Sequence, residues 1–286
     1  MSLKLKNAKG LMLNPNFIQE GRPIKNFIYL DEPNSGISKN KNNWSKRFFN
    51  LHEGSTKEIE INKNGFRCEE FKKQHEDFHI LFMGCSVTWG TGLKIEETWS
   101  NKLYNKFLKQ NKLSGYFNLG VPGDSIFSQT LHAFKYFKNF GNPNLIFFNI
   151  PDLERFYAYS ENDKSIVGAS IHKDKYEIFD LLNYQYYYML DQYCHSNNIK
   201  LMSFTWEEDE TNFIKSNIKN FNTFYPINQK NLLDYVNLYC SLNLNEKFSR
   251  IARDNIHFGT AHNDYWANFM YEKYKNPDDG FRNLQN

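Results

Sequence analysis

The chain has 286 residues, with 35 Lys and Arg against 32 Asp and Glu, which gives a formal net charge of +3. At roughly 150 residues per domain, this length allows one large domain or one domain with an appendage. Hydrophobic residues make up 40% of the chain and charged residues 23%, and this composition excludes an intrinsically disordered protein. A net charge this small gives no reason to expect a nucleic-acid partner.

The N-terminus and the cysteines bear on the compartment. Residues 1–10 contain lysines but lack the apolar core of ~7–15 residues that a signal peptide needs. The longest apolar runs, such as Leu145–Phe148, are far shorter than the ~20 residues of a membrane span, so we expect no membrane partner. The four cysteines form no Cys-x-x-Cys pair, which favours reduced thiols in a cytoplasmic protein over a zinc site or a redox motif.

Residues 1–76 differ from the rest of the chain. They are polar, with turn-forming runs at Asp31–Gly36 and Ser38–Asn43 and only short apolar stretches. Lys57–Asn62 alternates polar and apolar residues, which predicts a half-buried strand. We therefore predict an N-terminal extended arm over residues 1–76 that packs on the body instead of forming its own core.

Residues 77–286 alternate between short apolar runs and longer segments with helical spacing. The sequence predicts strands at Ile80–Met83, Tyr116–Leu119, Leu145–Phe148 and Ile199–Phe204, and helices at Glu97–Gln110, Ile126–Phe140, Lys175–Asn197 and Ala261–Tyr274. Strands separated by helices of this length imply a parallel sheet with helices on both faces. The predicted fold class is therefore α/β, in three α/β/α layers around a parallel, flavodoxin-like central sheet.

In such a sheet, ligands bind beyond the carboxyl ends of the strands. The segments there are Gly84–Gly90, Asn118–Ser125 and Asn149–Arg155, together with Asp254–Gly259 just before the last helix. They supply a hydroxyl, glycine N–H donors, and a histidine with a carboxylate three residues before it, which are the parts of an acyl-transfer site. Taken alone, Ser86 would be expected only to cap a helix, so the prediction depends on the whole set.

The set resembles the SGNH (GDSL-like) hydrolases, a family of serine esterases. Their first block, Gly-Asp-Ser-x-(Ser/Thr)-x-Gly, matches Gly84–Gly90 except that Cys85 replaces the Asp. Their second block matches Asn118–Ser125, which places the family's oxyanion glycine on Gly123.

The family's fifth block also has a counterpart near the C-terminus. Its Asp-x-x-His-(Pro) pattern matches Asp254 and His257, with Phe258 where proline is usual. The resemblance thus runs from residue 79 to residue 275, with its landmarks in the family's order, and implies that residues 77–286 form an SGNH-like hydrolase domain.

The third block departs from the family. Its Gly-x-Asn-Asp falls on Asn149–Asp152, where Pro151 occupies the position of the Asn that donates to the oxyanion. Asn149 is the nearest amide, and it would need a shifted loop to serve. Arg155 is a second candidate, either for the oxyanion or for a carboxylate or phosphate on the substrate.

The resemblance implies a Ser-His-Asp esterase. Ser86 attacks the ester carbonyl, His257 takes the serine proton, Asp254 orients His257, and the backbone N–H groups of Ser86 and Gly123 hold the oxyanion. No metal and no organic cofactor are implied. An acceptor alcohol in place of water would make the same site a transferase.

Two groups of residues favour a small-molecule or glycan ester carrying an acetyl-type acyl group. Polar residues are expected around the site, namely Asn118, Asp124, Asn149 and Arg155. Aromatic residues are expected to flank it, namely Trp89, Phe258 and Trp206.

The alternative is a non-catalytic protein that keeps the fold, for example a glycan-binding or virion component. Cys85 and the third block favour this alternative, whereas Ser86, Asp254 and His257 in the family's order oppose it. The expected location is accordingly cytoplasmic or virion-associated, and the sequence predicts no oligomeric state.

Two neighbours of these motifs are expected to have structural roles. We expect Cys85 to point away from Ser86 and pack beneath the sheet as a small hydrophobic residue, not to act as the nucleophile. We expect His262, on the last helix, to face solvent.

Overall fold

A four-stranded parallel sheet forms the centre of the protein in the computed structural model, which describes residues 62, 64, 66–73, 75–153, 155–160, 165–170, 177–206, 224–246, 248–252 and 257–276. Its strands are β1 (Ile80–Met83), β2 (Phe117–Asn118), β3 (Leu145–Asn149) and β6 (Lys200–Phe204), in the spatial order β2-β1-β3-β6. All three neighbouring pairs are parallel. Ranked along the chain, these strands have the order 2-1-3-4 of a flavodoxin-like sheet, and the predicted α/β class is confirmed.

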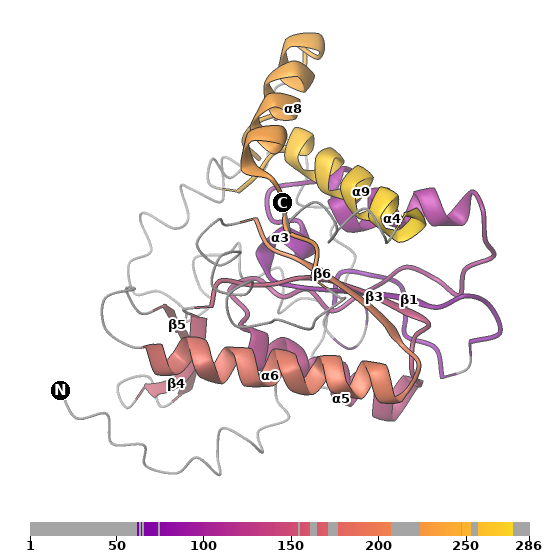
Figure 1. The fold of residues 1–286 in the computed structure, drawn as a ribbon, viewed down its shortest axis with the longest axis vertical. Coiled ribbons are helices and arrows are strands. Elements are labelled where there is room, and N and C mark those ends of the chain that lie inside the picture. The colour runs from indigo at the N-terminus through magenta and orange to yellow at the C-terminus, as the bar shows by residue number, and fades with distance from the viewer. Residues whose placement is uncertain are drawn as a thin grey trace, which may run out of the picture.

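Helices cover both faces of the sheet (Figure 1). Helices α4 (Trp99–Leu108) and α9 (Thr260–Lys275) pack together on one face, and α5 (Ile126–Phe140) and α6 (Glu177–Ser196) on the other. Neighbouring residues of β3 reach these two layers in turn, because successive side chains of a strand point to opposite faces. The ring of Phe147 lies 5.7 Å from that of Phe107 on α4, and the ring of Phe148 lies 6.2 Å from that of Tyr187 on α6.

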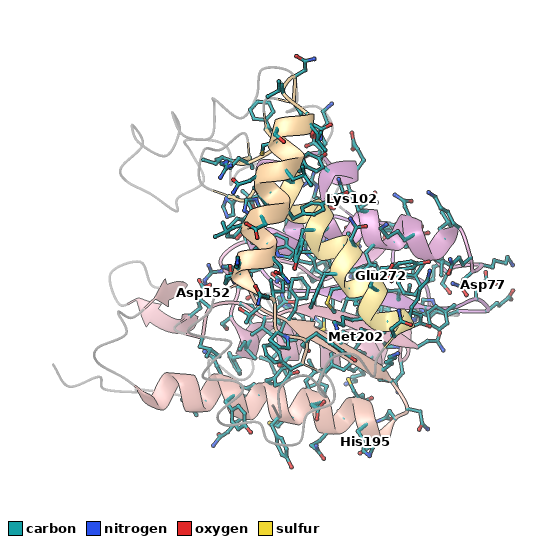
Figure 2. The ribbon with its side chains drawn as sticks, turned by 45° about the horizontal axis from the view of Figure 1, so that its top comes forward. Asp77, Lys102, Asp152, His195, Met202 and Glu272 are labelled. Carbon is teal, nitrogen blue, oxygen red and sulfur yellow. The ribbon has the colours of Figure 1, made fainter. Side chains whose placement is uncertain are left out.

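The core between the layers is largely aromatic. Phe82 of β1 stacks on Phe147 of β3 at 5.8 Å, and Trp99 of α4 meets Phe204 of β6 edge-on at 5.0 Å. Met202 of β6 is fully buried between the helix layers (Figure 2). Each such side chain contributes about 1.5–3 kcal/mol on burial, so the sheet is held mainly by hydrophobic packing.

The helix boundaries follow from local capping. The Ser125 side chain accepts a hydrogen bond from Ser128 N and begins α5, which has the predicted bounds. The Thr98 side chain accepts from Asn101 N and begins α4, while the short 3₁₀ turn η4 (Ile95–Glu97) precedes it. The predicted Glu97–Gln110 helix is therefore slightly shorter than expected, because Thr98 caps it.

Two of the described elements were not predicted from the sequence: the antiparallel hairpin of β4 (Arg155–Ser160) and β5 (Ser165–Ser170), and helix α8 (Gln229–Leu242). The helix expected to begin at Ser86 is present as α3 (Ser86–Trp89), which is four residues long. Helix α3 and the hairpin lie toward the same end of the sheet, and α8 projects beyond α9 (Figure 1). None of the described helices combines the length and hydrophobicity that a membrane span requires.

The described part of the arm, between residues 62 and 76, packs on the body. Phe66 and Phe71 are buried in the core, and the ring of Phe71 lies 4.9 Å from that of Tyr136 on α5. The predicted strand Lys57–Asn62 lies outside the described residues except for Asn62.

Candidate active site

The first site segment is a sharp turn from β1 into α3. Gly84 has a φ of +148°, and a Cβ there would lie 2.1 Å from Thr88 Oγ1 and 2.8 Å from the carbonyl oxygen of Asn149. A side chain at this position would push α3 away from the strand end, so the turn requires glycine. Ser86 is the first residue of α3 and is 6% exposed, as the motif predicts for a residue at a helix start.

The second segment runs beside this turn. Leu119 N donates to Phe82 O at 2.8 Å, and Val121 N donates to Gly84 O at 3.2 Å. At Gly120, an added Cβ would lie 2.8 Å from Trp89 N, so the loop touches the backbone of α3. The loop after β2 and the turn carrying Ser86 thus form one packed unit at the carboxyl edge of the sheet.

The third segment carries His257 and is fixed to α9 and α4. Ala252 N donates to the carbonyl oxygen of His257 at 2.9 Å. The amide of Asn263 on α9 donates to Gly259 O at 2.9 Å and accepts from Trp99 N, also at 2.9 Å. Asn263 therefore ties the segment that follows His257 to the start of α4.

Ser86 and His257 line one pocket. Its other described lining residues are Val87, Gly90, Thr91, Leu93, Phe258 and Asn263. The structure therefore brings together a serine from the start of the domain and a histidine from its end, 171 residues apart in the numbering of the chain. The predicted third member, Asp254, lies outside the described residues.

The prediction for Cys85 was wrong in part. The side chain is fully buried, as expected, but it does not point away from Ser86, whose hydroxyl donates to Cys85 Sγ at 3.9 Å. The reason is that Cys85 and Ser86 lie in the turn into α3 and not in a strand, so the strand alternation of successive side chains does not apply to them. Burial raises the pKa of the Cys85 thiol, and the nearby Arg155 opposes that rise.

Arg155 and Asn149 do not line the described part of the pocket. Arg155 is held by an ion pair of its Nη2 with Asp152 Oδ2 at 2.5 Å, while among the described residues its buried Nη1 has no hydrogen-bond partner. Figure 2 shows Asp152 beside the hairpin of β4 and β5. Asn149 is fully buried at the end of β3, and neither polar atom of its side chain has a hydrogen-bond partner among the described residues.

Gly123 has a φ of +77° and is exposed, and a Cβ added there would have no atom within 4 Å. It also lies outside the described pocket lining. The space beside its Cα is therefore unobstructed, whereas Gly120 is the glycine that contacts α3.

Two of the polar residues expected around the site are instead buried and bonded to neighbouring groups of the protein. Asn118 is 1% exposed, and its Nδ2 donates to Thr88 O at 2.9 Å. Asp124 is fully buried, and its Oδ2 lies 3.3 Å from His132 Nδ1. Asn118 and Asp124 were placed around the site because they are polar. Residue type alone does not distinguish a polar side chain at the entrance of a site from one that is hydrogen-bonded in the interior.

Of the three aromatic residues expected at the site, Phe258 lines the pocket. Trp206 is 9% exposed and packs against Phe258, with ring centroids 6.3 Å apart, and Trp89 is covered by the guanidinium of Arg67 at 4.9 Å from its ring. The prediction that His262 faces solvent was also wrong. It is 8% exposed, its ring lies 4.9 Å from that of Phe258, and burial lowers its pKa to about 4.

One supporting residue comes from outside the predicted domain. Arg67, which is 4% exposed, donates from Nη1 to Gly90 O at 2.8 Å and from Nη2 to Leu93 O at 2.9 Å. Both acceptors belong to residues that line the pocket. Neither Arg67 nor Asn263 was predicted, because their partners are backbone groups that carry no sequence signal.

The described residues contain no group of three His, Cys, Asp or Glu side chains able to hold a metal ion. No protein-family model matches the chain, and no curated protein matches it in sequence.

Several solved structures are similar to the chain. One is the psychrotrophic esterase EstA from Pseudoalteromonas sp., with 14% identity and a TM-score of 0.46, covering 73% of this chain and 100% of that one. The acetyl xylan esterase AlAXEase has 17% identity and a TM-score of 0.43, covering 68% of this chain and 98% of its own. TesA has 11% identity and a TM-score of 0.44, covering 70% of this chain and 99% of its own. At such scores these likenesses say nothing about the site.

Proposed function

We propose that the protein is a serine hydrolase that cleaves small-acyl esters, with Ser86 as the nucleophile and His257 as the general base. The observation that carries the proposal is that these two side chains line the same pocket at the carboxyl edge of the sheet. A hydroxyl and an imidazole in one small pocket are the minimum needed for nucleophilic acyl transfer.

In the proposed reaction, Ser86 Oγ bonds to the ester carbonyl carbon while its proton passes to His257. The carbonyl oxygen takes the electron pair and becomes an oxyanion. When the intermediate collapses, the bond to the alcohol oxygen breaks, and the alcohol leaves with the proton from His257. Water then attacks the acyl-serine by the same route and releases the acid. Asp254 would orient the imidazole and stabilise its charged form.

The proposed oxyanion donors are the backbone N–H groups of Ser86 and Gly123. Arg155 is the proposed third donor in place of the family's Asn. Its buried Nη1 has no hydrogen-bond partner among the described residues, and its guanidinium interacts electrostatically with Cys85, the neighbour of Ser86. Asn149, whose amide is also unpartnered among the described residues, is the second candidate for this role. Loss of one such donor costs ~2.7–4 kcal/mol of transition-state stabilisation, so a replacement donor matters for the rate.

The proposed substrate class is an acetyl-type ester, with a glycan hydroxyl as the alcohol. The described lining of the pocket leaves little free space, which favours a small acyl group over a long chain. Phe258 in the pocket wall offers an aromatic face to an acyl methyl group or to a sugar ring.

The test is hydrolysis of p-nitrophenyl esters from acetate to laurate by the wild type and by Ser86→Ala. We expect the wild type to prefer acetate and Ser86→Ala to lose activity by ~10³-fold or more. Ser241→Ala, which removes an exposed hydroxyl on α8, is the matched control and should keep full activity. Rates that increase with chain length would contradict the acetyl-glycan assignment but not the nucleophile.

The second candidate function is a non-catalytic binding protein with this fold. Pro151 at the donor position and Cys85 in the first block favour it. A wild type that binds glycans but hydrolyses none of the esters, with no difference between wild type and Ser86→Ala, would support this candidate.

A further inference from the structure

Gln129 connects the two segments that would supply the oxyanion donors. The residue is on the first turn of α5 and is fully buried. Its Oε1 accepts from Gly84 N at 2.9 Å, two residues before Ser86. Its Nε2 donates to Leu119 O at 2.9 Å and to Asp124 Oδ2 at 2.5 Å, next to Gly123.

This amide satisfies groups that the sheet leaves unpaired. Gly84 lies just beyond the end of β1, where the strand ladder stops, so its N–H needs another acceptor. Leu119 lies just beyond β2 in the same way, and its carbonyl needs another donor. A glutamine side chain has both an acceptor and two donor hydrogens, so a single residue can serve both strand ends.

The bonds also fix the relative position of the two loops. The Gly84 backbone cannot move freely, because α3 packs against it within contact distance. The carboxylate of Asp124 is held on its other side by His132, with Nδ1 at 3.3 Å. Gln129 therefore lies between two anchored points, one at the start of the Ser86 turn and one at the end of the Gly123 loop.

We propose that Gln129 is a positioning residue for ester hydrolysis, setting the distance between the Ser86 and Gly123 N–H donors by bonding Gly84 on one side and Leu119 and Asp124 on the other. This inference rests on the proposed function. An oxyanion hole needs its donors ~2.7–3.1 Å from the developing charge, so a small shift of one loop weakens the transition state more than substrate binding.

The test uses Gln129→Glu, which keeps the shape of the side chain but replaces the donor group by a carboxyl. When ionised, the introduced carboxylate has no hydrogen to donate to Leu119 O and places a second negative charge beside Asp124. Burial and that like charge raise the pKa of the new carboxyl, so it becomes protonated, and regains a donor, as the pH falls. At pH 8 we expect kcat for p-nitrophenyl acetate to fall ~10–100-fold with KM within about threefold of wild type. The ratio of variant to wild-type kcat should then increase at least about fivefold between pH 8 and pH 5.5.

Gln129→Met separates hydrogen bonding from titration, because methionine has a similar volume and neither a donor amide nor a titratable group. It should show the same loss of kcat at pH 8 without recovery at pH 5.5. Gln185→Glu, at an exposed position of α6, introduces the same carboxyl and should follow the wild type at every pH. Tyr187→Phe removes a buried hydrogen bond to Ser203 Oγ on the α6 face, so it should lower the melting temperature and leave kcat unchanged.

The outcomes distinguish this inference from the function on which it rests. If the wild type shows no Ser86-dependent hydrolysis, the proposed function fails and this inference fails with it. If hydrolysis depends on Ser86 but Gln129→Met keeps wild-type kcat and KM, the inference alone is overturned. A Gln129→Glu to wild-type ratio that does not change with pH would overturn it as well. If Gln129→Glu does not fold, the kcat of Gln129→Met decides.

Discussion

Cys85 and Ser86 lie side by side, and their chemistry differs because of their surroundings. The thiol is fully buried, and burial raises its pKa, so at neutral pH it is protonated. A protonated thiol is a poor nucleophile, since the thiolate is the reactive form. Ser86 instead lies in the wall of the pocket together with His257. The side chain that shares a pocket with His257 is therefore that of Ser86, whereas Cys85 is buried.

Replacing Cys85 with Ala should therefore leave ester hydrolysis largely intact. We expect kcat for p-nitrophenyl acetate within about threefold of wild type and a loss of about 1 kcal/mol in the free energy of unfolding, typical of a small cavity. Iodoacetamide should not abolish the proposed activity of the native protein, because the thiol is buried and protonated. A loss of activity in Cys85→Ala as large as that in Ser86→Ala would show that the thiol takes part in the reaction.

Helix α3 is too short to be stable by itself, so its position depends on groups that bind its ends. Its last carbonyls, at Trp89 and Gly90, accept from Arg67 Nη1 at 3.1 and 2.8 Å. A cation at a helix C-terminus is favourable, because the carbonyl ends carry partial negative charge. The planar guanidinium reaches Leu93 O as well, which a single ammonium group cannot do in the same geometry. The segment before the α/β body thus holds one wall of the pocket.

Arg67→Lys tests this role of the arm. Lysine keeps the charge but has a single nitrogen in place of the two guanidinium donors, Nη1 and Nη2. Buried hydrogen bonds to a charged group contribute ~1.5–3 kcal/mol each, so we expect a loss of about 2–3 kcal/mol in the free energy of unfolding. Urea denaturation measures it, with Arg250→Lys, at an exposed position, as the control that should change stability by less than about 0.5 kcal/mol. Equal stability of Arg67→Lys and wild type would mean that the two guanidinium donors of Arg67 are not needed to hold α3.

The elements that the sequence predicts well are those with an unbroken pattern. Ile80–Met83 and Leu145–Phe148 are continuous apolar runs because both faces of the sheet are covered, and both are strands. Helix α5 was predicted at its observed bounds, because Ser125 and Gly141 bracket a helical spacing. The hairpin of β4 and β5 was missed, since it lies outside the βα alternation on which the prediction depends.

The site was predictable only where a residue carries its own chemistry. Ser86 and His257 were identified from motifs, and the structure places both at one pocket. Gln129, Asn263 and Arg67 were not, because each acts through hydrogen bonds to backbone groups. Asn263, for example, accepts from the backbone of Trp99, 164 residues away. Such pairings leave no periodicity or motif in a single sequence.

Buried histidines make the whole molecule sensitive to acid. His79, which is 1% exposed, stacks on His75 with ring centroids 3.6 Å apart, and its Nε2 lies 2.8 Å from Tyr136 Oη. Burial, together with the neighbouring His75, lowers the pKa of His79 to about 3. His262 on the opposite side of the sheet has its pKa lowered to about 4 by burial and by Arg250. Both are therefore neutral in the folded protein at pH values where they are protonated in the unfolded chain.

The sign of the effect follows from this difference. A histidine with a depressed folded pKa contributes stability that is complete above its unfolded pKa of about 6.5 and is lost as the pH falls toward the folded value. His79 and His262 each lower the free energy of unfolding by about 1.4 kcal/mol per pH unit in this window. We therefore expect it to fall by on the order of 3 kcal/mol between pH 7 and pH 5.

Urea denaturation at pH 7, 6 and 5 measures the slope of the free energy of unfolding against pH. His79→Gln removes one of the two titrations and should roughly halve it, whereas His195→Gln, at an exposed position on α6, should not change it. A wild-type free energy that stays constant over this range, or a His79→Gln slope equal to that of the wild type, would contradict the assignment of acid sensitivity to the buried His79.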